Sequence, residues 1–215
     1  MTKLDAFQLT INKDLGELNN KRKELLVKEL SGYYEHHDPD APEGIMFMYN
    51  SLENNDEEFQ QVDDERIVVS DGLVISSDEI TFLKSAEDKK IIDITSITSI
   101  VKQVVNTLLL DEDKLGISME LRHSISIEGS APEKSLELFS TFGINNVKAV
   151  GANFLIDEMD YASQFSIKPV VKIEKEFVCT ERINYKTDIA LEDLEGVITN
   201  AIEQFHSRED AVIQS

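Results

Sequence analysis

Apolar and polar residues alternate without interruption along a stretch that begins at Leu115 and ends at Glu128. The odd positions hold apolar residues and His123, whereas the even positions hold mainly serine, glutamate and arginine. Alternation with period two is typical of a β-strand with one buried and one solvated face. Usual strands have about 5 or 6 residues, so we expect this longer one to bend or to carry a bulge.

Two segments of the first half have apolar residues at helical spacing. One covers residues 15–30, and Gly32 is placed to end it. The other begins after Asp93, a residue type that caps helices well. Its predicted buried stripe consists of Ile94, Ile97, Val101, Val104, Val105 and Leu108.

Two further helices are predicted in the second half. Ser130 and Glu133 form a capping box, and Gly143 is placed to end the helix that follows. Thr187 or Asp188 is expected to cap the last helix, and we expect the chain from His206 onward to fray. The predicted core stripe of this helix is Leu191, Leu194, Ile198, Ala201, Ile202 and Phe205.

Shorter strands are predicted around the long one, with loops at 33–44 and 51–65. Residues 147–157 are predicted to form a buried strand with several small side chains, including Gly151. We expect a neighbouring helix to approach the backbone there, and a ligand is the alternative. The other predicted strands are 7–11, 44–50, 66–76, 79–85, 165–178 and 181–186.

Together these elements predict an α+β fold. Its mainly antiparallel sheet has the strand from Leu115 to Glu128 at its centre, and three to four amphipathic helices pack mostly on one face. A chain of 215 residues is expected to form a single domain, 1–215. The order strand, strand, helix occurs twice, over about 66–128 and 147–206, so two related halves are a further hypothesis.

The chain is strongly acidic, with 42 acidic and 21 basic residues and a net charge of -21. Phosphate backbones and anionic membrane surfaces bind proteins through Lys and Arg, so direct binding to nucleic acid or to a membrane is disfavoured. A protein partner with a basic surface is favoured instead, because opposite charge steers association. A homo-oligomer is compatible with the sequence.

An acidic run in residues 51–65 is expected to form an exposed loop that could contact such a partner. The run lacks the ordered ligand spacing of an EF-hand. Its candidate partner-binding residues are Glu53, Asp56, Glu57, Glu58, Asp63, Asp64 and Glu65.

Other features of the sequence indicate the cellular compartment of the protein. No apolar run is long enough to span a bilayer, and the first residues lack the apolar core of a signal peptide. Cys179 is the single cysteine, so the chain forms no internal disulfide. These features predict a cytoplasmic protein.

Candidate metal ligands cluster at His36, His37, Asp38 and Asp40, because imidazole and carboxylate groups together bind transition metals. Adjacent residues of an extended chain point in opposite directions, however, and the nearby prolines indicate an exposed loop. The favoured interpretation is therefore a solvated acidic loop.

Two other residues could take part in chemistry. His123 lies among apolar residues of the long strand and is interpreted as a core histidine with one hydrogen bond. Cys179 could be a nucleophile if His123 or His206 activated it, but a buried structural thiol is favoured. The common phosphate-binding, dinucleotide-binding, serine-hydrolase and zinc-protease motifs are absent, and no cofactor is predicted.

Three functions follow, in order of preference. The first is a non-catalytic acidic protein-binding module, such as an inhibitor, an assembly factor or a chaperone-like interaction protein. The second is a nucleic-acid mimic that inhibits a DNA- or RNA-binding enzyme. The third is a metal-dependent enzyme with its site near His36 and His37, although a catalytic function is the less favoured hypothesis.

Overall fold

The computed structural model describes residues 4–34, 36–39, 41, 44–48, 72–85, 93–108, 114–139, 146–170 and 172–214. These residues form an α+β fold in which four helices accompany a ten-stranded antiparallel sheet. This confirms the fold class predicted from the hydrophobic pattern. No helix among them combines the length and apolar character needed to cross a membrane.

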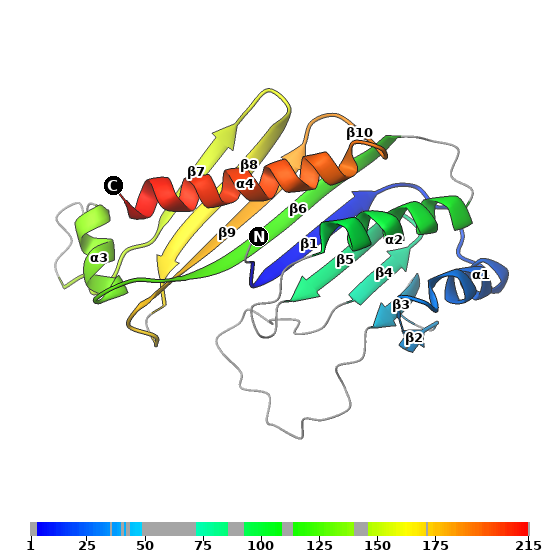
Figure 1. Cartoon of the computed structure of the whole chain (residues 1–215), viewed down its shortest axis with the longest axis horizontal. Coiled ribbons are helices and arrows are strands. Elements are labelled where there is room, and N and C mark those ends of the chain that lie inside the picture. Colours follow the sequence, from blue (N-terminus) through cyan, green and yellow to red (C-terminus); the bar gives the residue numbers. More distant parts are fainter. Residues whose placement is uncertain are drawn as a thin grey trace, which may run out of the picture.

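The strands are ordered β2-β3-β4-β5-β1-β6-β9-β8-β7, and β10 pairs with β6 (Figure 1). The first half of the chain supplies β1 (Ala6–Asn12), β2 (His36–Asp38), β3 (Gly44–Met48), β4 (Gly72–Ser76) and β5 (Glu79–Ser85). The second half supplies β6 (Lys114–Ser126), β7 (Ala152–Asp157), β8 (Tyr161–Pro169), β9 (Glu176–Tyr185) and β10 (Ile189–Ala190).

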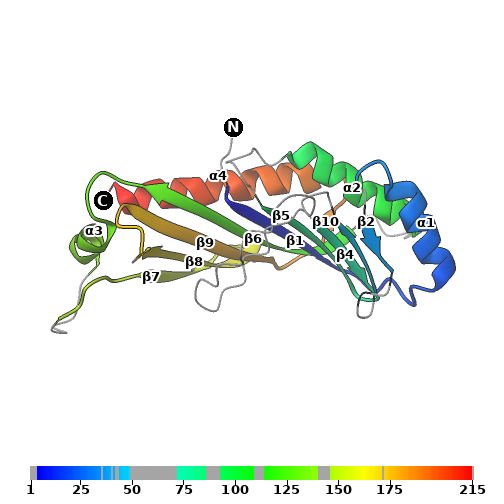
Figure 2. The same cartoon turned by 90° about the horizontal axis from the view of Figure 1, so that it is seen from below.

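The helices are α1 (Asn20–Leu30), α2 (Ile94–Thr107), α3 (Ala131–Leu138) and α4 (Leu194–Ile213). Figure 2 shows α2 and α4 along the same face of the sheet, which we call the covered face; the opposite one is the open face. Helix α1 packs beside α2, and α3 contacts β8. Buried residues of both halves join in one hydrophobic core cluster.

The connectivity of the sheet is repeated. Apart from the three-residue strand β2 after α1, the first half has the order β1, α1, β3, β4, β5 and α2, and these strands lie in the order β3-β4-β5-β1. Apart from the two-residue strand β10 before α4, the second half has the order β6, α3, β7, β8, β9 and α4, and these strands lie in the order β7-β8-β9-β6. The two halves meet where β1 pairs antiparallel with β6, which is the pairing that a two-fold rotation would produce.

The long strand β6 lies at the centre of the sheet, as predicted. Ile117, Met119 and Leu121 are buried on the covered face, with exposed fractions of 3%, 3% and 0%. Of the two predicted alternatives, a bend or a bulge, the bulge is wrong, because β6 pairs residue by residue with β1 and with β9 without a skipped position. The bend stays a prediction. Strand β6 pairs with β1 on one side and with β9 and β10 on the other. The first residue of β1, Ala6, lies opposite Arg122, so β6 continues beyond β1 along β9.

Helix boundaries follow the capping residues. Asp93 accepts a hydrogen bond from the Ser96 backbone, and Ser130 accepts one from the Glu133 backbone, as predicted. Helix α1 begins later than predicted because Asn19 caps it. Helix α3 ends at Leu138, and Gly143 lies outside the described residues.

Two strand predictions were wrong in position. The predicted loop 33–44 contains β2, which pairs with β3 through His36 and Met48. The predicted strand 165–178 is two strands, because the chain turns between Pro169 and Glu176, where the backbone of Val170 bonds that of Glu176. The turn contains the charged residues Lys172, Glu174 and Lys175, which lie within the predicted strand 165–178.

Strand β7 is not buried, contrary to the prediction for residues 147–157. It lies at the edge of the sheet, and Leu155 is 84% exposed. A side chain at Gly151 would meet the backbone of β8, 3.1 Å from the Ile167 carbonyl oxygen, so the close neighbour is a strand rather than the expected helix.

The end of the chain does not fray at His206. Helix α4 continues to Ile213, and Phe205 and Glu209 are buried against the sheet. The predicted stripe is confirmed from Leu194 to Phe205, but Leu191 lies before the helix. The predicted caps Thr187 and Asp188 are wrong, because the N-cap of α4 is Asp193, which makes no side-chain cap hydrogen bond. The last two turns of α4, after Phe205, carry polar residues on the same side. Among these, Arg208 contacts Glu181 of the sheet and Glu209 contacts His123.

Candidate functional site

Polar side chains occur on the covered face where α4 crosses the second half of the sheet. The register aligns His123 of β6 with Cys179 of β9, and Glu181 of β9 with Phe165 of β8. Glu181 has an exposed fraction of 0%. Buried polar groups require partners, and the last turns of α4 supply them.

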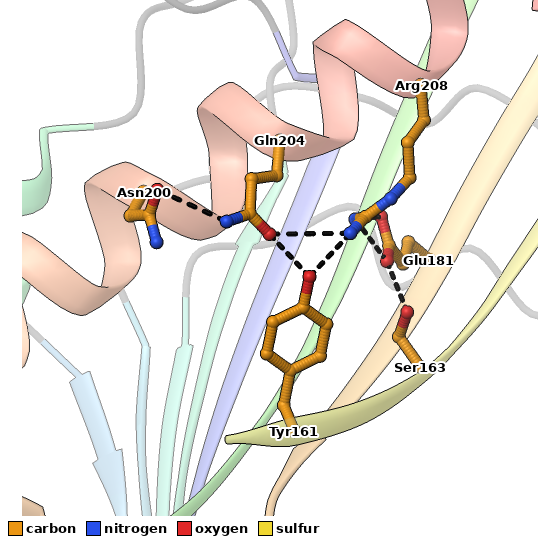
Figure 3. Close-up of polar contacts among 6 residues, drawn as sticks. All are labelled: Tyr161, Ser163, Glu181, Asn200, Gln204 and Arg208. Carbon is orange, nitrogen blue, oxygen red and sulfur yellow. Dashed lines mark hydrogen bonds and ion pairs between the residues drawn. The ribbon is translucent and has the colours of Figure 1, made fainter. Parts of the chain in front are cut away.

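The first group is the Glu181 network, which consists of Tyr161, Ser163, Glu181, Gln204 and Arg208 (Figure 3). Nη1 of Arg208 donates to both carboxylate oxygens of Glu181, at 2.6 and 2.9 Å, and Ser163 Oγ donates to Oε1 at 2.6 Å. Nη2 of Arg208 donates to the Tyr161 hydroxyl, which in turn donates to Gln204 Oε1, each at 2.5 Å. The network therefore joins α4 to β8 and β9.

The ion pair in this network is strongly coupled. Burial alone would lower the pKa of the Arg208 guanidinium, but the charge and hydrogen bonds of Glu181, with those of Tyr161, raise it above its ordinary value. Among the described residues, no buried side-chain nitrogen or oxygen atom of this network lacks a hydrogen-bond partner. A satisfied buried network fixes one arrangement of helix and sheet, and we interpret this one as structural.

The second group is the histidine–glutamate cluster, which consists of His123, His206 and Glu209. Oε2 of Glu209 lies 3.1 Å from His123 Nδ1 and 2.6 Å from His206 Nδ1. The two imidazole rings meet edge to face with centroids 5.2 Å apart. The Glu209 side chain is 2% exposed, whereas those of His123 and His206 are 21% and 26% exposed.

The charge of Glu209 is maintained by the two histidines. Burial alone would raise the pKa of its carboxyl, but hydrogen bonds and charge from His123 and His206 outweigh this and lower the pKa. His206 Nε2 is buried and has no hydrogen-bond partner among the described residues. A proton on that nitrogen would be unsatisfied, so we assign Nδ1 as the nitrogen of His206 that donates to Glu209.

Cys179 lies on β9 next to this cluster. Its exposed fraction is 0%, and burial together with the neighbouring Glu209 raises the pKa of its thiol well above the ordinary range. A thiol that stays protonated is a poor nucleophile. The interpretation of Cys179 as a buried structural thiol is therefore supported over the nucleophile hypothesis.

Exposed apolar residues gather at the β7 edge of the sheet. Phe154 is 40% exposed, Leu155 is 84% exposed, and Met159 in the turn between β7 and β8 is 87% exposed. We call these three residues the β7 edge surface. Asp157, which ends β7, is the first of several acidic residues beside it; the others are Glu158 and Asp160.

The open face carries a shallow polar depression of about 370 Å³ over β6, β8 and β9. Arg122, Lys168 and Arg182 contribute three cations, and Glu120 pairs with Arg182 at 2.8 Å. The depression is therefore locally basic on a chain that is acidic overall. Its remaining lining residues are Gln164, Ser166 and Thr180.

The structure places only some of the residues predicted from the sequence. His36, His37 and Asp38 form β2 and are exposed, and adjacent residues of a strand project to opposite sides. The His37 ring lies 6.4 Å from that of Phe47. Asp40 and the acidic run from Glu53 to Glu65 lie outside the described residues, so these assignments stay predictions.

Sequence reasoning missed the histidine–glutamate cluster. His123 Nδ1 and Glu209 are 86 positions apart in the chain, and Glu209 was expected to lie in a frayed tail. The one local signal was the spacing of His206 and Glu209, three residues apart on what proved to be a single helix face.

Comparisons with protein-family models, with curated proteins and with solved structures found no match for this chain. The fold and the side-chain geometry are therefore the basis for assigning a function.

Proposed function

We propose that this protein is a non-catalytic protein-binding module that adds an extended segment of a partner to the β7 edge of its sheet. The observation that carries the proposal is the exposure of Leu155 and Met159 beside an edge strand. A strand at the end of a sheet presents backbone N–H and C=O groups that another chain can pair with. In the described part of the chain, β7 pairs with β8 only.

The two ends of the sheet differ in a way that supports this assignment. Strand β2, at the other end, has three residues, His36–Asp38, all polar and exposed. Short polar edges are a common protection against unwanted pairing. Strand β7 is twice as long, with six residues of sequence ANFLID, and it carries neither proline nor lysine. It thus lacks the usual protection and is suited to pairing.

Charge selects the kind of partner. Asp157, Glu158 and Asp160 surround the β7 edge surface, although Asp157 is paired with Lys186 at 2.6 Å. The net charge of -21 opposes association of two copies of the chain. We therefore expect an extended segment with apolar residues at alternate positions and with lysine or arginine between or beside them.

Binding of a defined peptide tests the proposal. The probe is a fluorescent peptide that alternates lysine and valine, and its counterpart alternates glutamate and valine. We expect the basic peptide to bind the wild-type chain, and Leu155→Ser with Met159→Ser to weaken it by about tenfold or more. The matched control replaces two exposed apolar residues elsewhere, Leu25→Ser with Ile173→Ser, which are 40% and 49% exposed.

Equal binding by both double variants would show that the peptide is held by charge alone and would overturn the assignment. Sedimentation of the wild-type chain supplies a second outcome. A dimer that the Leu155 and Met159 variant disperses would assign the edge to self-association instead. The nucleic-acid mimic and the metal-dependent enzyme near His36 and His37 stay alternative predictions, and no described contact favours them.

A further inference from the structure

The histidine–glutamate cluster brings three potential metal ligands together from two elements. His123 is on β6, and His206 and Glu209 are on α4. One ligand atom from each lies within 4.8 Å of the others. Ligand atoms that share a Zn²⁺ ion at bond lengths of about 2.0 to 2.2 Å are separated by roughly 3.3 Å in a tetrahedral site. Glu209 Oε2 lies 3.1 Å from His123 Nδ1, which is near that spacing, and 2.6 Å from His206 Nδ1, a distance that must widen when an ion binds.

We propose that His123, His206 and Glu209 bind a transition-metal dication of the Zn²⁺ class. Two imidazoles and one carboxylate suit zinc, cobalt or iron, whereas calcium and magnesium prefer sites made only of oxygen. The partial exposure of both imidazoles gives an ion access from solvent, while Glu209 supplies a buried negative charge. This binding is independent of the β7 edge and adds to the proposed function.

Protons compete with the metal at these nitrogens. In the metal-free cluster the imidazoles share hydrogen bonds with Glu209, so an ion bound at both Nδ1 atoms must displace the protons there. The proton of His206 then moves to Nε2, which is buried without a partner in the described chain. Leaving that donor unsatisfied weakens binding by about 10- to 100-fold, so we expect moderate affinity that falls as the pH is lowered.

The four histidines of the chain allow a matched test, because they form two pairs: His36 with His37, and His123 with His206. Chelator-treated full-length protein is titrated with Zn²⁺ by calorimetry and with Co²⁺ by visible absorption. We expect one site per chain at about pH 7 and weaker binding at about pH 6, because protons compete with the metal for the imidazole nitrogens. His123→Gln with His206→Gln should weaken binding about tenfold or more, and His36→Gln with His37→Gln should leave it unchanged.

A measurement on the unmodified protein keeps the proposal testable if the His123 and His206 variant does not fold. Two histidine ring spin systems should shift on addition of Zn²⁺, and the melting temperature should rise with Zn²⁺ but not with Mg²⁺. Unshifted His123 and His206 resonances at saturating Zn²⁺ would overturn the proposal. Loss of binding in the His36 and His37 variant would overturn it as well, and would assign the metal to the exposed strand β2 instead.

Discussion

Nη1 of Arg208 lies 2.6 Å from Oε1 of Glu181, a carboxylate with no exposed surface. The pair spans the interface between α4 and β9, and Ser163 and Tyr161 complete its hydrogen bonds. Helix α4 is thus held to the sheet by a buried ion pair as well as by its apolar stripe.

Removing the cation of this pair should destabilise the fold strongly. In Arg208→Ala the carboxylate of Glu181 stays buried without its counter-charge, and we expect the free energy of unfolding to fall by about 3–5 kcal/mol. The matched control is Arg182→Ala, which breaks an ion pair with Glu120 whose side chains are 70% and 39% exposed. Exposed pairs contribute about 0–1 kcal/mol, so the control should change little.

Chemical denaturation of the two variants measures both values. Similar small losses in Arg208→Ala and Arg182→Ala would show that the buried pair contributes no more than an exposed one. The Glu181 network would then have no special part in holding α4 to the sheet.

Alkaline pH should destabilise the protein through Tyr185. Burial, together with nearby Tyr161 and Glu181, raises the pKa of Tyr185 from 10.0 to about 12. The folded state thus favours the neutral phenol, so its contribution to stability is complete below the pKa of the unfolded chain, near 10.0, and is lost as the pH rises toward about 12.

The variant Tyr185→Phe isolates this effect, because phenylalanine does not ionise. The difference in unfolding free energy between wild type and variant should be constant below about pH 10 and should fall above it. A free-energy difference that stays constant up to a pH of about 12 would contradict the prediction. Ultraviolet absorbance offers a second test, and it would contradict the prediction if every tyrosine formed phenolate at the ordinary pKa of about 10.

Gly44 should tolerate no side chain. A Cβ atom there would lie 2.0 Å from the Ile75 carbonyl oxygen of β4, so Gly44→Ala must separate β3 from β4. Overpacking of this kind typically costs about 1–3 kcal/mol, and backbone is harder to displace than a side chain. We therefore expect a loss at the upper end of that range.

Gly72 provides the control, since it lies at the other end of the same strand pair. A Cβ atom at Gly72 would be 3.5 Å from the Phe47 carbonyl oxygen, an ordinary contact. Thermal unfolding of Gly44→Ala and Gly72→Ala should show a clearly lower melting temperature for the former. Equal melting temperatures would mean that β3 shifts freely along β4.

The repeated connectivity suggests that the two halves arose from one unit, and we offer this as a proposal. The halves differ where the polar clusters lie. Helix α2 has 14 residues and a mainly apolar buried face, whereas α4 has 20 residues and carries Arg208 and Glu209 near its end. Strand β6 similarly extends past β1 to include His123. The extra length of both elements therefore creates the polar sites of the second half.

Much of the fold could be predicted from the sequence because its signals are local. The alternation along β6 depends only on which side of a strand faces the core, and Asp93 and Ser130 cap their helices through backbone groups three residues away. Where the signal was ambiguous the prediction was wrong: the apolar residues of β7 indicated burial, yet the position of a strand in the sheet decides its exposure.

The candidate sites depended on tertiary structure. His123, Glu181 and Glu209 are polar residues that no sequence pattern pairs, because strand register and the path of α4 bring them together. The sequence by itself determined the periodicity, the caps and the acidic character of the chain, all of which follow from neighbouring residues or from composition. Only the folded arrangement decided which polar groups are buried together and which apolar edge is exposed, since both depend on contacts between residues far apart in the chain.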